Sequence, residues 1–280
     1  MNTLDRAQIV ARLKQLPSLP AAVSELLASF ENEDVDVSRI AQLIGRDQGL
    51  TARVLRVANS SFYGLQSRVS TINEAVVVLG FRAVRSMVLA VGLSGTFRGD
   101  QCKGFDALAQ LRHGIGVGLA ARALAKLSGH TADLAFTAGI LHDVGQLVLA
   151  ANFSKQYAAT LAYRCQHDCL LVVAERDVLS IDHGEVGGLL AEVWRFPPAL
   201  REALAEHHAP ANAPAGSLAD VVHVADAIAH GLGLSQLPDE MVMPVDRTAW
   251  QRINLDDAGL ASVLARVVAE MEETCQALTV

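Results

Sequence analysis

Apolar residues recur at intervals of three and four positions along most of the chain, and strict alternation does not persist anywhere for long. Such spacing gathers the apolar side chains on one face of an α-helix, whereas a half-buried strand needs alternation. Short apolar runs such as 76–79 would suit strands, but their flanking residues favour helix. The pattern predicts an all-α chain with helices at roughly 7–16, 20–30, 39–44, 48–59, 72–80, 81–93, 106–128, 131–150, 154–167, 169–178, 183–194, 198–208, 217–232 and 256–277.

Helix boundaries are marked by side chains that can accept hydrogen bonds from the first turn of a helix. Thr71 followed by Glu74 has the spacing of a capping box. The other predicted caps are Asp36 or Ser38, Asp47, Thr131, Asp182 and Ser217. The polar, glycine-rich segment 95–104 interrupts the helical pattern. We expect it to separate an N-terminal helical subdomain over 1–100 from a second helical subdomain over 101–280, in which 209–216 and 231–247 form loops.

The composition supports a large helical core. Hydrophobic residues make up 51% of the chain, charged residues 19% and aromatic residues only 5%. The net charge of −7 disfavours a protein that binds nucleic acid over its whole surface. The first ten residues lack the regions of a signal peptide, and Arg82 and Arg85 interrupt the most apolar stretch, 76–93. These features predict a cytoplasmic protein without a membrane-spanning segment.

His142 and Asp143 are adjacent within the apolar stretch 139–149. A buried carboxylate is costly unless an opposite charge or a hydrogen bond compensates it. A metal ion or a protonated histidine would supply that charge. We therefore interpret this pair as metal ligands inside a helix of the core, and the alternative is a hydrogen-bonded core pair.

Further candidate ligands stand at the ends of predicted helices or within apolar runs: His113, His183, His207, His208 and Asp226. Imidazole and carboxylate together suit Zn, Mn, Fe or Ni. The helix dipole also favours histidine at a helix C-terminus, which is an alternative explanation for the paired histidines. His223 lies one turn before Asp226 and can pair with it. Four histidines are interpreted as having no part in a site: His130, His167, His223 and His230.

The order His113, His142–Asp143, Asp226 resembles the H…HD…D pattern of HD-domain metal-dependent phosphohydrolases. In that family all four residues bind metal, and a metal-bound water attacks a phosphate ester. His183 and the pair His207–His208 resemble the additional ligands of the HD-GYP subgroup, which hydrolyses cyclic di-GMP with two or three ions. If the chain is active, the resemblance makes Asp143 the catalytic proton acceptor.

From about residue 16 to residue 230 the chain most resembles the HDOD family, the HD-related output domain of bacterial signalling. The resemblance is carried by LPSLPAAVSELL, IAQLIGRDQGLTARVLRVANSSFYG, INEAVVVLGFRAVRSMVLA, AGILHDVGQLVL, DHGEVGGLLAEVWRFPP and the ending EHH. It implies an HD-like helical bundle and a regulatory module that acts through partner contacts, either without catalysis or with a degenerate metal site. The alternative is a metal-dependent phosphohydrolase or phosphodiesterase acting on a nucleotide or cyclic dinucleotide. The implied cofactor is one or two divalent ions of Fe, Mn, Ni or Zn, or none.

The chain departs from the HD-GYP pattern at three points. Gln146 replaces a lysine after the HD pair, Ala109 replaces a glutamate one turn before His113, and the residues after His208 do not resemble a GYP loop. Losing the lysine removes a point charge that would hold a phosphate. Losing the glutamate weakens one metal position. These departures disfavour hydrolysis of cyclic di-GMP and favour the regulatory interpretation.

Residues 36–98 carry eight arginines, no lysine and only three acidic residues. Because arginine makes forked contacts with carboxylates and phosphates, this region predicts a docking surface for an acidic protein partner in a signalling pathway. Solvated helix faces and internal ion pairs are the alternative, and a nucleotide ligand stays open. The HDOD resemblance explains the helix-turn-helix cadence of 40–59, so nucleic acid is disfavoured. The arginines are Arg39, Arg46, Arg53, Arg56, Arg68, Arg82, Arg85 and Arg98.

Overall fold

The computed structural model describes residues 3–16, 21–29, 36–60, 63–94, 101–237 and 240–278, and these residues form helices and no strand, as predicted. The N-terminal helices are α1 (Arg6–Leu13), α2 (Ala21–Ala28), α3 (Val37–Arg46), α4 (Gln48–Ala58), α5 (Ile72–Leu79) and α6 (Phe81–Ser94). The remaining elements are α7 (Ala107–Ser128), α8 (Ala132–Leu141), α9 (Val144–Asn152), α10 (Ser154–His167), α11 (Leu171–Leu179), α12 (His183–Val193), α13 (Pro198–Glu206), η1 (Pro210–Asn212), α14 (Leu218–Gly231), α15 (Arg247–Ile253) and α16 (Asp257–Leu278).

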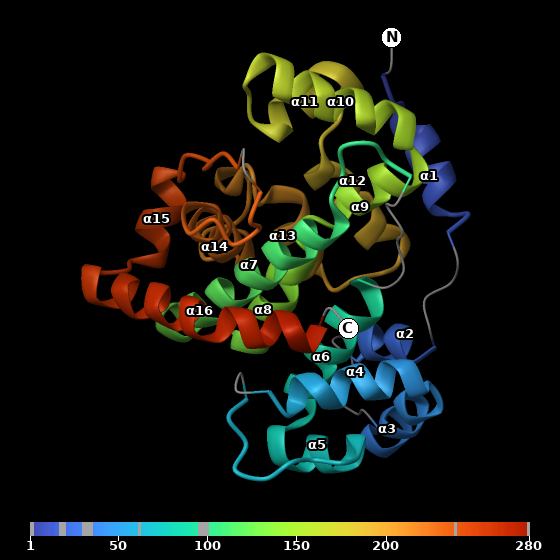
Figure 1. The fold of residues 1–280 in the computed structure, drawn as a ribbon, viewed down its shortest axis with the longest axis vertical. Coiled ribbons are helices and arrows are strands. Elements are labelled where there is room, and N and C mark those ends of the chain that lie inside the picture. Colours follow the sequence, from blue (N-terminus) through green and yellow to red (C-terminus); the bar gives the residue numbers. More distant parts are fainter. Residues whose placement is uncertain are drawn as a thin grey trace.

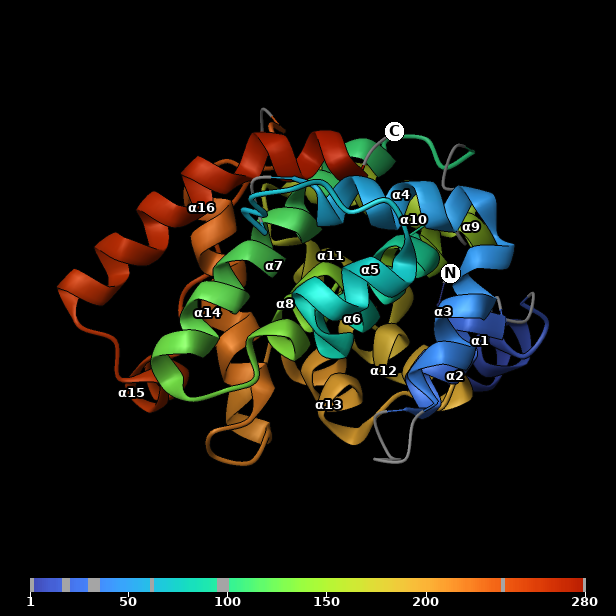
Figure 2. The same ribbon diagram turned by 90° about the horizontal axis from the view of Figure 1, so that it is seen from below.

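Helix α7 is central to the arrangement, and it packs against α8, α14 and α16 (Figure 1). Helices α2 to α6 gather at one end of the molecule, where α6 contacts α8 and α16 contacts α4 (Figures 1 and 2). The first helix, α1, lies apart from this group and packs against α12. Buried apolar side chains from both halves of the chain belong to one hydrophobic core. The subdomain boundary at residue 100 stays a prediction.

Most of the predicted helix caps are confirmed. The side chains of Asp36, Asp47, Thr71, Asp182 and Ser217 each accept a hydrogen bond from a backbone N–H in the first turn of the following helix. Thr131 also stands at its predicted N-cap position, at the start of α8, but its side chain forms no capping hydrogen bond. Pro20, Phe30 and segment 95–100, which were assigned to a helix or a loop, lie outside the described residues.

Two element boundaries differ from the prediction. The helix expected over 131–150 is interrupted, since α8 ends at Leu141 and α9 begins at Val144. The two residues between them are His142 and Asp143, which therefore stand in a turn rather than inside a helix. Helix α15 was not predicted. It begins after Asp246, whose side chain accepts hydrogen bonds from two backbone N–H groups.

Close backbone contacts at glycines bring these helices together. A Cβ on Gly139 of α8 would lie 2.7 Å from the Cα of Gly118 on α7, so the two helices can approach this closely only without side chains there. Likewise, a Cβ on Gly145 of α9 would overlap the carbonyl oxygen of His183 on α12. The break after α8 therefore places Asp143 beside both α7 and α12.

The stretch Ala132–Asn152, which spans α8 and α9, is long and apolar enough for a membrane helix. However, 78% of it is buried inside the helical body. A mostly buried core helix passes the same test of length and composition, so the stretch is weak evidence for a membrane segment.

The close approach of α9 to α12 can be tested with Gly145→Ala. We expect this substitution to lower the free energy of unfolding by about 1–3 kcal/mol, because the new methyl group would displace the His183 backbone. Gly45→Ala is the control, since nothing lies within 4 Å of a Cβ at that helical position. Urea unfolding of both variants measures the difference. Wild-type stability for Gly145→Ala would contradict the described packing.

Candidate metal centre

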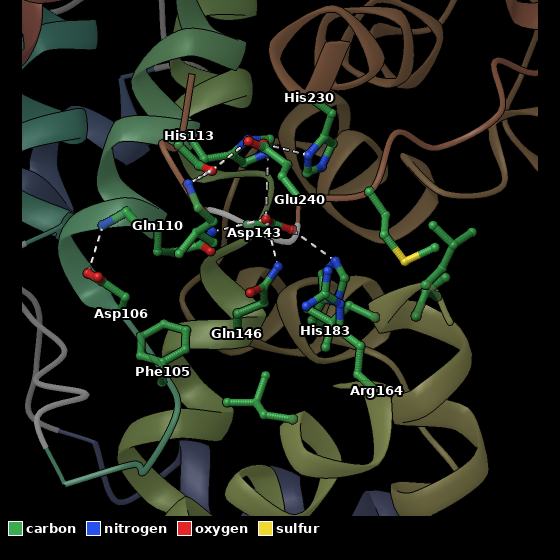
Figure 3. Close-up of a pocket in the computed structure, with 18 of the residues that line it drawn as sticks. Phe105, Asp106, Gln110, His113, Asp143, Gln146, Arg164, His183, His230 and Glu240 are labelled. Atoms are coloured by element: carbon green, nitrogen blue, oxygen red, sulfur yellow. Dashed lines mark hydrogen bonds and ion pairs between the residues drawn. The ribbon is translucent and has the colours of Figure 1, made fainter. Parts of the chain in front are cut away.

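All seven residues predicted as metal ligands meet in one chamber inside the helical body. Five elements supply them, and Figure 3 shows His113, Asp143 and His183 directed toward one another. Six of the seven are buried, and only His208 is half-buried. The seven are His113 from α7, His142 and Asp143 from the turn between α8 and α9, His183 from α12, His207 and His208 from the end of α13, and Asp226 from α14.

One group of side chains surrounds Asp226. Its Oδ1 lies 2.9 Å from His113 Nε2 and 3.6 Å from His142 Nε2. The second carboxylate, Asp143, is close to the same imidazoles, with Oδ2 3.4 Å from His142 Nε2 and 4.0 Å from His113 Nε2. These four residues are the ones that match the H…HD…D pattern.

A second group lies on the other side of Asp143. Its Oδ1 is 2.9 Å from His183 Nε2 and 3.6 Å from His207 Nε2. His208 Nε2 lies 2.6 Å from His183 Nε2, which implies that one of these nitrogens carries a proton and the other accepts it. Ligand atoms of Asp143, His183, His207 and His208 all lie within 4.8 Å of one another. Asp143 therefore faces both groups, one through each carboxylate oxygen.

The imidazoles are oriented through their Nδ1 atoms. His142 Nδ1 donates to the carbonyl of Gly139 at 2.7 Å, and His207 Nδ1 donates to the carbonyl of Leu204 at 2.9 Å. Both carbonyls belong to the last turn of the preceding helix. Because Nδ1 donates to a carbonyl, Nε2 is the nitrogen directed into the chamber, as in many metal-binding histidines.

Three buried atoms that face the chamber have no hydrogen-bond partner within the described residues: His142 Nε2, His207 Nε2 and Asp143 Oδ1. Asp143 Oδ1 forms an ion pair with His183 Nε2 at 2.9 Å, and no hydrogen bond is assigned to it. Buried polar atoms normally have partners, so an orphaned set on converging side chains needs an explanation. Two nitrogens and one carboxylate oxygen are a donor set that fits a divalent transition metal.

The other carboxylate oxygen of Asp143, Oδ2, accepts hydrogen bonds from two side-chain amides. The donors are Gln110 at 2.9 Å and Gln146 at 2.7 Å. Gln146 is the residue at the position of the HD-GYP lysine, so the substitution replaces a free cation with a fixed neutral donor. The sequence analysis did not assign Gln110 to the site.

Glu175 of α11 is a further member of the site that sequence reasoning missed. Its carboxylate is fully buried and accepts hydrogen bonds from His183 Nδ1 at 2.6 Å, His183 N–H at 2.9 Å and the Tyr157 hydroxyl at 3.0 Å. A carboxylate on Nδ1 fixes the tautomer of an imidazole and strengthens Nε2 as a ligand. Glu175 therefore orients His183 toward Asp143.

Two predictions for the remaining histidines were wrong. His223 does not pair with Asp226, because its Nδ1 donates to the carbonyl of His207 and its Nε2 accepts from the backbone N–H of Asp246. His230, interpreted as having no part in a site, lies at the chamber, with Nε2 3.3 Å from Asp226 Oδ1. The signal for His230 was its spacing, since positions 226 and 230 share one face of a helix.

The two buried aspartates are held in the ionised form. Burial acts to raise the pKa of Asp143, but the positive charges of His142 and His183 outweigh it and hold the pKa well below its ordinary value. Burial also acts to raise the pKa of Asp226, and hydrogen bonds from His113 and neighbouring imidazoles hold this pKa well below its ordinary value. The carboxylates can therefore offer negative oxygens to a cation.

The imidazoles differ in charge. Burial acts to lower the pKa of His183, but the carboxylates of Glu175 and Asp143 raise it well above its ordinary value. Burial also acts to lower the pKa of His142, but the carboxylates of Asp143 and Asp226 raise it. Burial lowers the pKa of His207 and, more strongly, that of His208, and positive neighbours contribute to both shifts. The chamber without an ion thus combines protonated and neutral imidazoles, and protons and a metal ion would compete for it.

A cavity of about 190 Å³ adjoins the chamber and gives it access from outside. Its polar end is formed by the cluster, and apolar side chains of α10, α11 and the segment after α14 form the opposite wall (Figure 3). Arg164 is among the lining residues, whereas the described lining includes no lysine. The apolar wall consists of Leu161, Leu170, Leu171, Val172, Met241 and Met243.

Comparisons with known proteins agree with this architecture. The family model for the HDOD domain matches residues 16–210. An uncharacterised protein from Treponema pallidum (strain Nichols) is 28% identical over 211 residues, which cover 74% of this chain. The match spans only 40% of that protein, so this chain corresponds to less than half of the relative.

Solved structures show the same fold. The crystal structure of a candidate phosphohydrolase from Shewanella amazonensis SB2B is 32% identical, with a TM-score of 0.77 over 96% of this chain and 97% of the other. An HDOD domain protein of unknown function from Geobacter sulfurreducens has a TM-score of 0.82, with 98% and 99% of the chains covered. Its identity of 24% supports the fold alone.

The role of Glu175 can be measured with two substitutions, one that removes its carboxylate and one that removes a single hydrogen bond to this carboxylate. Glu175→Ala should lower the free energy of unfolding by about 3–5 kcal/mol, because it leaves His183 buried without its partner. Tyr157→Phe removes only one hydrogen bond to Glu175 and should cost about 0.5–1.5 kcal/mol. Chemical denaturation measures both values. Equal losses would mean that the contact with His183 contributes little.

Proposed function

Because this chain belongs to the HDOD family, we propose that it is a bacterial regulatory module that binds a divalent transition metal and acts through partner contacts rather than by substrate turnover. The observation that carries the proposal is the state of Asp143, whose Oδ2 accepts two amide hydrogen bonds while its Oδ1 faces the imidazoles. This carboxylate is arranged to hold a cation rather than to exchange protons with a substrate.

The residues present fit a metal ion. His142, His207 and Asp143 each direct an atom without a hydrogen-bond partner among the described residues into the chamber. His113, His183, His208 and Asp226 complete the set that would hold one or two ions. When bound, the ion would supply positive charge and Lewis acidity. The side chains of the protein orient the imidazoles and keep the aspartates ionised.

The two amides argue against catalysis. On Oδ2 of Asp143 both lone pairs are engaged by Gln110 and Gln146, so only Oδ1 could accept a proton, and the neighbouring histidines hold the pKa of this carboxyl well below its ordinary value. An effective general base needs a free lone pair and a pKa near the working pH. With Gln146 in place of the lysine, the chamber also lacks that point charge for a phosphate.

We propose that the partner is an acidic protein that docks on α3 to α6. Arg46, Arg68 and Arg82 are exposed in this part of the chain. Two of the other arginines serve internal contacts. Arg39 pairs with Glu25 at 2.7 Å, and Arg85 donates to the carbonyl of Ser29. Arg98 lies outside the described residues.

The alternative function is a metal-dependent phosphohydrolase acting on a nucleotide or cyclic dinucleotide. Two observations favour it: the cavity that opens onto the cluster, with Arg164 at its side, and the 32% identity to a candidate phosphohydrolase. In that case Asp143 would accept the proton, and its hydrogen bonds with Gln110 and Gln146 would have to break.

Metal analysis and turnover assays distinguish the two functions. We expect protein purified without chelator to contain Fe, Mn, Ni or Zn, and Asp143→Asn to contain less, because it loses a negative ligand. A bound ion should also raise the unfolding temperature in proportion to its free concentration. Loaded with Mn²⁺, Fe²⁺ or Ni²⁺, the wild type should hydrolyse bis-p-nitrophenyl phosphate, cyclic di-GMP and nucleoside triphosphates no faster than Asp143→Asn.

His167→Gln is the control for these assays, because His167 is exposed on α10 and contacts only Tyr163 among the described contacts. Metal-dependent turnover that His167→Gln retains and Asp143→Asn abolishes would establish the phosphohydrolase. Protein that neither contains metal nor can be loaded with it would refute both functions.

Metal affinity should increase with pH. The neighbouring carboxylates raise the pKa values of His142 and His183 and so favour their protonated forms, and such a proton must leave before Nε2 can bind a cation. We expect the dissociation constant to fall from about pH 6 to about pH 8, with protons released on binding. Calorimetric titrations in buffers of different ionisation enthalpy measure both quantities. An affinity independent of pH would place the ion elsewhere.

A further inference from the structure

We propose that His230, held by Glu240, is an additional metal ligand beside His113, His142 and Asp226. The inference rests on the proposed binding of a metal, and it adds to the ligand set a residue that the HD and HDOD resemblance does not include. Both His230 and Glu240 lie beyond the region 16–210 that matches the family.

The first support is the orientation of the imidazole. His230 Nδ1 donates to Glu240 Oε1 at 2.8 Å, which leaves Nε2 directed toward Asp226. The same arrangement holds His183, whose Nδ1 donates to a carboxylate while Nε2 faces the other aspartate. A carboxylate on Nδ1 is the usual outer partner of a metal-binding histidine.

The second support is the convergence of nitrogens on one oxygen. Asp226 Oδ1 lies 2.9 Å from His113 Nε2, 3.3 Å from His230 Nε2 and 3.6 Å from His142 Nε2. The rings of His113 and His230 are neighbours, with centroids 4.3 Å apart. His113 thus belongs to two groups whose potential ligand atoms lie within 4.8 Å of one another, one with His142 and Asp226 and one with His230 and Glu240. Imidazole and carboxylate together suit Zn, Mn, Fe or Ni.

Glu240 is itself fixed in place. Its Oε2 accepts a hydrogen bond from the Ser235 hydroxyl at 2.7 Å, while Oε1 accepts from His230 and lies 3.9 Å from His113 Nδ1 (Figure 3). Oε2 is therefore held by Ser235, and Oε1 is left to orient the imidazole of His230. This makes Glu240 a positioning residue for His230 rather than a free acid.

His230 also stands where the HD-GYP resemblance leaves a metal ligand missing. Residue 109, one turn before His113 on α7, is alanine, although the resemblance to HD-GYP enzymes predicts a glutamate ligand there. His230 approaches the same group from α14, four residues after Asp226 and on the same helix face. The number of donor residues around Asp226 is thereby maintained with a nitrogen in place of a carboxylate.

The test is a titration with Co²⁺ and Zn²⁺ of the full chain after removal of bound metal. Glu240→Gln should weaken binding by about 10–100-fold, as expected for the loss of an outer partner. His230→Ala should weaken it at least as much and shift the visible bands of bound Co²⁺, because a nitrogen ligand is replaced. Added imidazole should restore the affinity and the visible bands of His230→Ala, since the side chain of His230 is 24% exposed and lines the cavity.

His167→Ala is the matched control and should bind Co²⁺ with wild-type affinity and an unchanged spectrum, with or without imidazole. His230→Gln provides a second variant if His230→Ala does not fold, and circular dichroism reports on folding. Wild-type affinity and spectrum in a folded His230 variant would overturn this inference while leaving the proposed function intact. A wild type that binds neither ion would instead refute the proposed metal binding itself.

Discussion

Two buried aspartates impose the main physical constraint on this fold. Asp143 and Asp226 are almost completely removed from water, and a buried carboxylate without compensation would be strongly destabilising. No single helix can supply the compensation, because imidazoles must approach each carboxylate from several sides. The chain meets this requirement by directing α7, α12, α13, α14 and the turn between α8 and α9 at one chamber. The packing of the second half of the chain and the candidate metal centre thus have one cause.

The inner residues depend on an outer layer that fixes each imidazole. Backbone carbonyls hold His142 and His207, and Glu175 and Glu240 hold His183 and His230. In each case Nδ1 is engaged and Nε2 faces the aspartates, so one chemical rule describes histidines from four different elements. Such preorganisation is useful for binding a cation tightly, and it is compatible with a role that involves no turnover.

Gln146 illustrates how one side chain can alter the chemistry of a site within a shared fold. As an uncharged donor it stays hydrogen-bonded to Asp143, whereas a lysine at the same place would present a charge to a phosphate. The remaining cavity, with its apolar wall and Arg164, stays accessible beside the cluster. The proposed regulatory function and its hydrolytic alternative would therefore differ in a few polar contacts and not in the fold.

The sequence by itself determined the helical class, most helix boundaries and the seven candidate ligands, because apolar periodicity, capping residues and the HD pattern are local signals. It did not locate the break between α8 and α9, or the close approach of Gly145 to the backbone of His183 that follows this break. Nor did it identify Glu175, His230 or Glu240 as members of the site. Their roles arise from contacts between separate elements, since a carboxylate on α11 or beyond α14 reaches an imidazole only after the helices have packed. Local spacing selects the elements, and tertiary packing decides which of their polar atoms meet.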